Sequence, residues 1–487
     1  MKSKNSPQRR ATSAVSGTRE CSPTTRPAQA GTAASLEALV HRYQRRRRPI
    51  AVNFRSLLPE LNSPDRFTHL IHPYPAKLLV HIPHFFLAND LLSAPGDLVL
   101  DPFCGSGTVL LEAQLAGRRA CGADANPLAR LIARVKTTRL NTDAAKESLA
   151  AVLDKLPARP TGPSPDVVNL DHWYYPSTAR QLQCLHEAIL RITNLQIRDF
   201  LLVCFSVCVR KVSLADPRLS VPVRLRVDQY PKNHPLHATT GARLRGLPHL
   251  RVSQVFANIA QSNILRFERL NASAPRNPDA EVLCSDARHL VNEYSLNGSR
   301  GTPLNDESVQ LILTSPPYPG AQKYIRSSSL SLGWLRLCPT SELRAYKGRT
   351  IGREEFTRLE SEQVPATNIS EADRLIAKIR KQSPIRATIA ATYLIEMRSA
   401  FQEMYRVLKP NGHIVMVVAN NRIAGRDFRT VDYLRTIAER CGLSLTACFI
   451  DAIRSRGLMT KRNHTASIIT REWILILAKG DAPQWSH

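Results

Sequence analysis

The stretch DLVLDPFCGSGTVLLEAQLAG, residues 97–117, constrains the fold of this chain more than any other. It is typical of a short buried strand that runs into a glycine turn and then into a helix. The next stretch, RRACGADANPLARLIARVK, begins at residue 118 and repeats the strand and the helix. Strands and helices that alternate at this spacing build a parallel sheet with helices on both faces.

Five more strands are expected at less regular intervals. Apolar runs near residues 281, 310, 413, 444 and 472 join those near residues 98 and 119, which predicts seven strands. Two stretches interrupt the rhythm: a helical, basic one over residues 137–279 and a charged, helix-prone one over about 324–385. The expected fold class is therefore α/β, a seven-stranded Rossmann-like sheet with helices on both faces, plus a largely helical basic insertion.

The charge of the chain indicates its partner. There are 67 Lys and Arg residues against 40 Asp and Glu, which leaves a net charge of +27. The pI is near 10.2. An excess of positive charge this large is typical of proteins that bind nucleic acid.

The chain shows no membrane or secretion signal. It has no run of about 18 apolar residues, and its N-terminus lacks the apolar core of a secretory signal. The ten cysteines form no C-x-x-C pair and no zinc-type cluster with histidine. We therefore expect a cytoplasmic protein with reduced thiols, no membrane contact and no metal site.

The turn that closes the first strand carries the groups of a nucleotide-type site. Gly105 and Gly107 let a ligand approach the backbone closely. Asp124 follows the next strand about 20 residues on, where an acid hydrogen-bonds ribose hydroxyls. Leu110 takes the place of the third glycine of the dinucleotide fingerprint. Since Asp101 also stands at the strand end, ready for an ammonium or a hydroxyl, a nucleoside with a charged amino-acid tail is favoured over NAD.

The stretch LILTSPPYPG, residues 311–320, ends another strand in a stiff turn. Pro316 and Pro317 cannot continue a sheet, because each lacks an N–H group and has a fixed φ angle. Open α/β sheets bind their ligands at the carboxyl ends of their strands. We therefore expect Ser315, free carbonyls and the ring of Tyr318 to form part of a ligand site.

DPFCGSGT, then GADANPLA, then TSPPY together resemble the amino-methyltransferase group of S-adenosylmethionine-dependent enzymes, which methylate exocyclic nitrogens of nucleic-acid bases. The TSPPY form resembles the DNA cytosine-N4 methyltransferases. The match covers about residues 67–136 and 280–480. The resemblance implies a methyltransferase sheet, S-adenosylmethionine as the cofactor, and double-stranded DNA as the substrate, with the target base flipped out of the duplex.

The resemblance also implies where the cofactor lies. Five residues would surround its methionine part: Asp101, Phe103, Gly105, Gly107 and Thr108. Asp124 would bind the ribose, and Asp286, in CSDAR, would lie beside the adenine. HPYPAK, residues 72–77, resembles the motif that flanks the cofactor, so Lys77 would approach the methionine carboxylate.

The TSPPY turn would hold the base. Ser315 and the Pro316 carbonyl would accept the two N–H groups of the exocyclic amine and aim its lone pair at the methyl sulfonium for direct in-line transfer. Pro317 would stiffen the turn, and Tyr318 would stack on the flipped base. No covalent cysteine is needed, and the Pro-Cys dipeptide of ring-carbon methyltransferases is absent.

The expected organisation has four parts. Residues 1–48 form a disordered basic arm, and residues 49–136 form the cofactor-binding half of the methyltransferase domain. Residues 137–279 form the helical insertion, and residues 280–480 form the catalytic half with its own insertion. Target recognition is expected in one of the two insertions. Residues 218–251 are the first choice for DNA contact, because they are rich in Arg, Lys and His.

Four functions stay open at this point. Methylation of cytosine N4 in DNA, typically part of restriction-modification, is preferred because the turn begins with serine. The cofactor motif precedes TSPPY, an order commoner among adenine-N6 enzymes, so methylation of adenine N6 in DNA is the closest alternative. The others are guanine-N2 methylation in RNA and a non-catalytic nucleic-acid-binding protein on the same scaffold.

Overall fold

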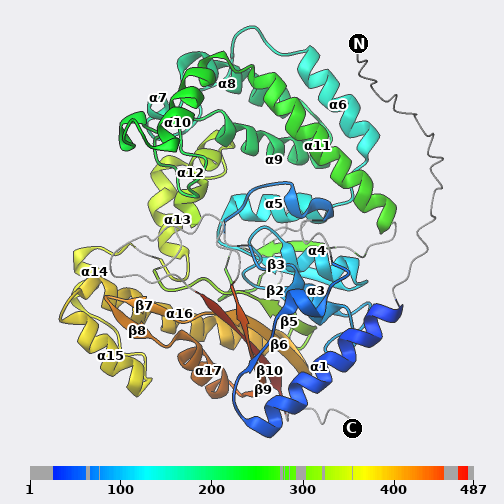
Figure 1. Ribbon diagram of the computed structural model, residues 1–487, viewed down its shortest axis with the longest axis vertical. Coiled ribbons are helices and arrows are strands. Elements are labelled where there is room, and N and C mark those ends of the chain that lie inside the picture. The colour runs from blue at the N-terminus through cyan, green and yellow to red at the C-terminus, as the bar shows by residue number, and fades with distance from the viewer. Residues whose placement is uncertain are drawn as a thin grey trace, which may run out of the picture.

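The computed structural model describes residues 26–61, 66–75, 77–274, 278, 280–284, 286–291, 303–320, 324–353, 355–453 and 470–480. Its centre is an eight-stranded sheet with the strand order β1-β9-β10-β6-β5-β2-β3-β4 (Figure 1). The strands are β1 (Ile50–Ala51), β2 (Leu98–Asp101), β3 (Arg119–Ala123), β4 (Ala280–Cys284), β5 (Val309–Thr314), β6 (Leu408–Val418), β9 (Leu443–Ala452) and β10 (Arg471–Lys479).

Neighbouring strands of this sheet are parallel except around β10, which runs antiparallel to both β6 and β9. All seven strands expected from the sequence are present, and the α/β fold class is confirmed. The eighth strand, β1, lies at the edge beside β9, and its two residues carry too little pattern to be predicted. A separate two-stranded hairpin joins β7 (Asn421–Ile423) to β8 (Arg426–Phe428).

Helices cover both faces of the sheet. They include α3 (His81–Leu87), α4 (Thr108–Leu115), α5 (Pro127–Thr137), α16 (Pro384–Val407) and α17 (Thr430–Arg440). Beside strands β6, β9 and β10, α1 (Arg26–Arg46) and α3 lie on one side and α16 and α17 on the other (Figure 1). The central strands are buried on both faces, which explains the unbroken apolar runs in β5 and β6.

The N-terminal segment is ordered where the structure describes it. Helix α1 (Arg26–Arg46) packs beside β9 and places Leu36, Val40 and Tyr43 in the main core. The expected disorder of residues 1–48 is therefore wrong for this helix. Its three core residues follow the i, i+4, i+7 spacing of a helix face, but they stand among small and basic residues that hide the pattern. Residues 1–25 lie outside the described residues.

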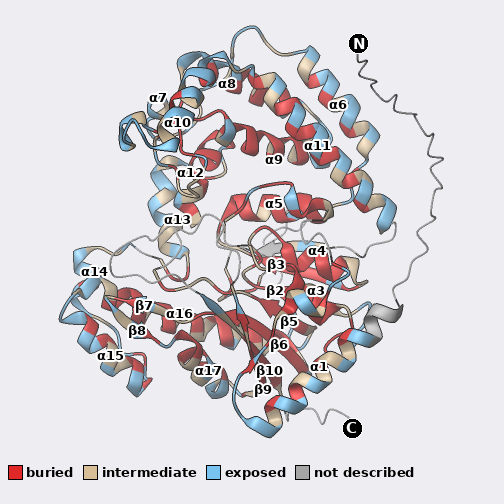
Figure 2. Ribbon diagram, viewed as in Figure 1, coloured by how far each residue is buried: buried red, intermediate tan, exposed pale blue. Residues whose placement is uncertain are grey.

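The first interruption folds into a helical region with a core of its own. Its helices are α6 (Thr142–Asp154), α7 (Leu170–Trp173), α8 (Pro176–Leu190), α9 (Leu195–Lys211), α10 (Pro235–Gly246) and α11 (Val252–Ser273). Figure 2 shows α9 as the buried helix of this region. Aromatic and aliphatic side chains from α8, α9 and α11 form the core, together with the outer face of α5.

Helix α12 (Tyr324–Trp334), from the second interruption, belongs to the same helical core. Trp334 is fully buried there and meets the rings of Tyr174 and Phe205 edge-on, with centroid distances of 5.5 and 6.0 Å. The hydroxyls of Ser206 and Ser331 lie 2.8 Å apart. The two interruptions, which are separate in the sequence, therefore share one core.

The remaining elements are short. They are α2 (Phe54–Leu57), α13 (Leu343–Arg349), α14 (Arg358–Glu362), α15 (Ser370–Arg380) and four 3-10 turns, η1 (Phe67–Leu70), η2 (Val227–Gln229), η3 (Leu247–His249) and η4 (Thr340–Glu342). Among the described residues, no helix is both long and apolar enough to span a bilayer. The eight cysteines whose side chains the structure describes are all free, and burial raises the pKa of Cys204 and Cys208 to about 12.

Candidate active site

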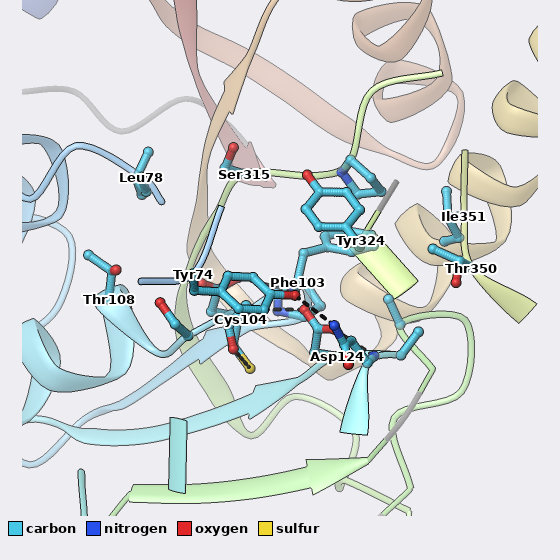
Figure 3. A pocket seen from close by; sticks show the side chains of 18 of the residues that line it. Tyr74, Leu78, Phe103, Cys104, Thr108, Asp124, Ser315, Tyr324, Thr350 and Ile351 are labelled. Atoms are coloured by element: carbon cyan, nitrogen blue, oxygen red, sulfur yellow. Dashed lines mark hydrogen bonds between the residues drawn. The ribbon is translucent and has the colours of Figure 1, made fainter. Parts of the chain in front are cut away.

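A cavity opens at the carboxyl ends of β2, β3 and β5 (Figure 3). The predicted site residues that line it are Lys77, Asp101, Phe103, Gly105, Thr108, Asp124, Asp286, Ser315 and Pro317. Gly107, Pro316 and Tyr318 are not among the lining residues. Two motifs that lie far apart in the sequence meet here because β2 and β5 are neighbours and run parallel.

Asp101 ends β2 inside the cavity wall and is 4% exposed. Its Oδ1 accepts hydrogen bonds from the Thr314 hydroxyl at 2.6 Å and from the Phe103 amide at 3.1 Å. Burial raises the pKa of Asp101 from 3.8 to about 7, although both hydrogen bonds oppose the rise. A positive group bound beside this carboxylate would favour its charged form.

The raised pKa of Asp101 makes a prediction about stability. The folded protein holds this proton up to about pH 7, whereas the unfolded chain releases it near pH 3.8. The Asp101 contribution to the free energy of unfolding therefore falls as the pH rises from about 4 to about 7. We expect Asp101→Asn to stabilise the protein more at pH 8 than at pH 5, measured by urea unfolding. An equal gain at both pH values would contradict the burial of a charge here.

The glycine turn and Asp124 hold each other in place. Gly105 has a φ of 49°, and its amide donates to Asp124 Oδ2 at 2.9 Å. The other carboxylate oxygen, Oδ1, accepts from the Asn126 amide at 2.8 Å. Burial raises the pKa of Asp124, while these two backbone hydrogen bonds oppose the rise. Each oxygen still has a lone pair to offer a ligand.

Gly107 has a structural position behind the turn. It precedes α4 with a φ of 76°, and a Cβ added to it would lie 3.0 Å from Cα and Cβ of Ala133 on α5. Only glycine allows both this backbone conformation and this close approach of α4 to α5. Gly107 therefore shapes the turn from outside the cavity.

Gly107→Ala is expected to destabilise the fold through strain and crowding together. The left-handed backbone costs about 1–2 kcal/mol, and crowding against Ala133 adds about 1–3 kcal/mol. Gly425→Ala is the matched control, because Gly425 has a φ of 75° with no atom within 4 Å of its added Cβ. Urea unfolding of the two variants separates the contributions, and equal losses would contradict the tight contact with α5.

Tyr74, Lys77 and Leu78 form a further wall of the cavity. The Lys77 ammonium lines the cavity and donates to the His69 carbonyl at 2.9 Å. The Asn126 side-chain amide donates to the Tyr74 hydroxyl at 3.2 Å and to the Ser328 hydroxyl at 2.9 Å. Asn126 thus joins this wall to the β3 loop and to α12.

The Ser315 turn leaves β5 at the mouth of the cavity. Ser315 and Pro317 line the cavity, whereas Tyr318 is half-buried and packs against the main core. Burial raises the pKa of Tyr318 well above its ordinary value, and a hydrogen bond with Ser315 opposes the rise. The Asn421 side-chain amide donates to the Pro319 carbonyl at 3.1 Å and holds the turn from the other side.

Part of the chain, including the glycine turn, is similar to a known protein family. Residues 53–134 match the model of the N6/N4 methyltransferase family, described as DNA methylase. The chain is related to the N6/N4 DNA methylase family. The family-level prediction made from DPFCGSGT and TSPPY is confirmed, and the coarse function that goes with it is DNA methylation at an exocyclic amine. The family name covers both N6 and N4, so it does not choose between adenine and cytosine.

Individual relatives are distant. The type II methyltransferase M.MvaI of Kocuria varians is 21% identical over 432 residues, which cover 84% of this chain and 90% of that protein. The type II methyltransferase M.MjaII of Methanocaldococcus jannaschii is 34% identical over 90 residues, 18% of this chain and 17% of that protein. A solved rRNA methyltransferase, aviRa from Streptomyces viridochromogenes, covers 84% of this chain and 89% of its own at 11% identity and a TM-score of 0.26, so nothing further follows from it.

Several lining residues of this cavity were not predicted. Asn126 carries a sequence signal, since it precedes Pro127 as the N-cap of a helix. Tyr324, Thr350 and Ile351 carry none, because the second interruption brings them to the cavity. Figure 3 shows Tyr324 near Ser315, with Thr350 and Ile351 beyond it.

Proposed function

We propose that this protein is a site-specific DNA methyltransferase that transfers a methyl group from S-adenosylmethionine to the exocyclic N4 amine of cytosine. The observation that carries the proposal is the meeting of Asp101, Asp124 and Ser315 in one cavity. Two relatives are named type II methyltransferases, which supports DNA as the substrate. We place the enzyme in the cytoplasm, acting on double-stranded DNA.

The lining residues fit the cofactor that the family implies. S-adenosylmethionine supplies an electrophilic methyl group on a sulfonium. The buried Asp101 carboxylate would take the ammonium of the methionine part, since a positive charge there offsets the burial of the carboxylate. Asp124 would accept the ribose hydroxyls with its remaining lone pairs. Ala287 and Ile351 make the cavity apolar beside Asp286, which suits a purine ring.

The glycine turn would lie against the methionine part of the cofactor. Phe103, Gly105 and Thr108 line this end of the cavity with Lys77. The Lys77 ammonium donates to the His69 carbonyl at 2.9 Å, and the side chain lines this end of the cavity. We propose that its positive charge approaches the methionine carboxylate.

The Ser315 turn would orient the base. The Ser315 hydroxyl and the Pro316 carbonyl would accept the two N–H groups of the amine and direct its lone pair away from the ring. The nitrogen would attack the methyl carbon in line and displace S-adenosylhomocysteine as the carbon–sulfur bond breaks, and the methylated amine would then release one proton to water; positioning and fixed dipoles would supply the catalysis. Pro317 would keep the turn stiff. This step needs no covalent bond between the protein and the base.

The stacking face for the base is better assigned to Tyr324 than to Tyr318. Tyr324 lines the cavity with Pro317, whereas Tyr318 packs against the core. Aromatic faces in a base pocket hold a flipped base by stacking. Tyr318 would then act on the base through its hydrogen bond with Ser315.

DNA contact by residues 218–251 is narrowed to a few side chains. Arg218 is bound to Asp216 and Tyr230. Arg224 and Arg243 donate to the backbone carbonyls of His172 and Lys211. The exposed basic side chains of this stretch include Lys232, Arg245 and Arg251, whereas the exposed Arg226 is paired with Asp228. We propose that Lys232, Arg245 and Arg251 contact backbone phosphates, which position DNA without reading its sequence.

A direct test incubates the full chain with methyl-labelled S-adenosylmethionine and, separately, DNA and RNA, and identifies the modified nucleoside by mass spectrometry. The proposal expects label in N4-methylcytosine from DNA. Label in N6-methyladenine would replace cytosine with adenine as the target. Label in N2-methylguanine from RNA, or none in either polymer, would overturn the proposed function.

A further inference from the structure

Residues 349–352, named here the strap, cross one end of the cavity from the second interruption. Arg349, Thr350 and Ile351 line the cavity. Figure 3 shows Thr350 and Ile351 across the cavity from Leu78 and Thr108. Ile351 is 5% exposed and belongs to the main core. The strap is therefore a packed wall of the cavity and not an external loop.

Arg288 anchors the strap to Asp286. Its guanidinium donates to both oxygens of Asp286, with a shortest distance of 2.8 Å, and to Glu396 at 3.1 Å. The same guanidinium donates to the Arg349 carbonyl at 3.1 Å. The Arg288 guanidinium thus joins Asp286, which follows β4, to Glu396 on α16 and to the strap. An arginine can make these three contacts because its N–H donors are held in a fixed planar fork.

Gly352 joins the other end of the strap to the Ser315 turn. Its carbonyl accepts from the Gly320 amide at 3.3 Å. Gly352 has a φ of 75°, and a Cβ added to it would lie 2.9 Å from the Tyr318 carbonyl oxygen. The Gly352 amide also donates to Glu396, the partner of Arg288. The strap is therefore held between the Asp286 end of the cavity and the turn that carries Ser315.

We propose that the strap couples the cofactor's adenine end of the cavity to the base-holding turn, with Arg288 and Gly352 as positioning residues. This inference rests on the proposed function of the cavity. A ligand beside Asp286 would fix the strap through Arg288 and Glu396, and the strap would fix residues 315–320 through Gly352. Coupling needs an element whose arrangement both sites bias, and the strap contacts both.

Hydrogen exchange of the full chain, with and without S-adenosylhomocysteine, tests the coupling. The Gly320 amide is the direct reporter, because it donates to the strap. We expect S-adenosylhomocysteine to slow exchange in residues 349–352 and also at Gly320. Its dissociation constant is measured in parallel by calorimetry, and single-turnover methyl transfer is measured with DNA from a methylation-deficient host.

Gly352→Ala breaks the link at the turn. The added Cβ forces the strap away from Tyr318, outside the cofactor end of the cavity. We expect nearly unchanged affinity for S-adenosylhomocysteine, loss of its protection of Gly320, and a single-turnover rate lowered by at least about fivefold, the range of ordinary coupling energies. Gly425→Ala, with the same φ and no neighbouring atom, is the control and should change none of these.

Arg288→Lys breaks the link at the Asp286 end of the strap. It tests the coupling independently, in case Gly352→Ala fails to fold. It keeps a positive charge beside Asp286 and Glu396, but one ammonium cannot reproduce the planar fork that also reaches the Arg349 carbonyl. We expect S-adenosylhomocysteine to protect Gly320 less in this variant than in the wild type, while its dissociation constant changes only slightly. Full protection of Gly320 in both variants would overturn the coupling.

The outcomes separate the two proposals. If S-adenosylhomocysteine binds the wild type without protecting Gly320, the coupling is wrong and the methyltransferase proposal stands. If Gly320 is protected but no methyl group reaches DNA, the coupling stands and the proposed function is wrong. If S-adenosylhomocysteine does not bind, both are wrong.

Discussion

Ser315→Ala is expected to lower kcat by about 100-fold, as does the loss of one positioned hydrogen-bonding group at a catalytic centre. The dissociation constant for S-adenosylhomocysteine should hardly change. Ser315 lies at the mouth of the cavity, on a different strand from the residues that would hold the cofactor. Methyl transfer to DNA at saturating cofactor, followed over several turnovers, measures kcat. Calorimetry measures the dissociation constant for S-adenosylhomocysteine.

Ser308→Ala is the matched control. Ser308 immediately precedes β5, whereas Ser315 immediately follows it, and the Ser308 hydroxyl donates to the Asn305 carbonyl at 2.7 Å. Loss of a hydroxyl there should leave both quantities unchanged. If Ser315→Ala instead weakened cofactor binding as much as it slowed transfer, Ser315 would belong to the cofactor half of the site and the base-holding role would be wrong.

Asp124→Asn is expected to weaken cofactor binding by about tenfold to a hundredfold, since a hydrogen bond to a charged group contributes about 1.5–3 kcal/mol. The carboxylate has one oxygen on the Gly105 amide and the other on the Asn126 amide. An asparagine side chain must turn its NH₂ group toward one of these N–H donors, so the glycine turn is disturbed as well. At saturating cofactor, kcat should fall much less.

Two comparisons make the Asp124 result specific. Asp143→Asn, whose side chain is 85% exposed on α6, should leave the dissociation constant unchanged. Thermal unfolding without cofactor shows whether Asp124→Asn also loosens the fold. If Asp124→Asn left the affinity for S-adenosylhomocysteine unaltered, the assignment of Asp124 as the ribose-binding residue would be wrong.

The glycine-turn residues and Asp124 were predictable as parts of one site because their signals are local. Asp101, Gly105 and Asp124 each stand where a strand ends and a helix follows, and parallel neighbouring strands bring such ends together. The Ser315 turn was predictable for the same reason, since prolines end its strand. That these residues meet in one cavity follows from the order of strands in the sheet.

The rest of the cavity depends on contacts that no short stretch of sequence encodes. Ile351 reaches it from a loop between two short helices, and Tyr324 reaches it because α12 is held by the helical core. Two arginines of the stretch predicted to contact DNA, Arg224 and Arg243, donate to the backbone carbonyls of His172 and Lys211, which their sequence positions do not reveal. Tyr318 was expected to stack on the base, but its side chain packs against the core.

The shared core of the two interruptions limits how this protein can be recombined. Trp334 belongs to the second interruption, yet it is packed against Tyr174 and Phe205 of the first. An exchange of residues 137–279 with a relative would leave this tryptophan against foreign partners, and the same helix begins at Tyr324 in the cavity. A functional chimaera therefore has to take both interruptions from the same parent protein, because they can be exchanged only together.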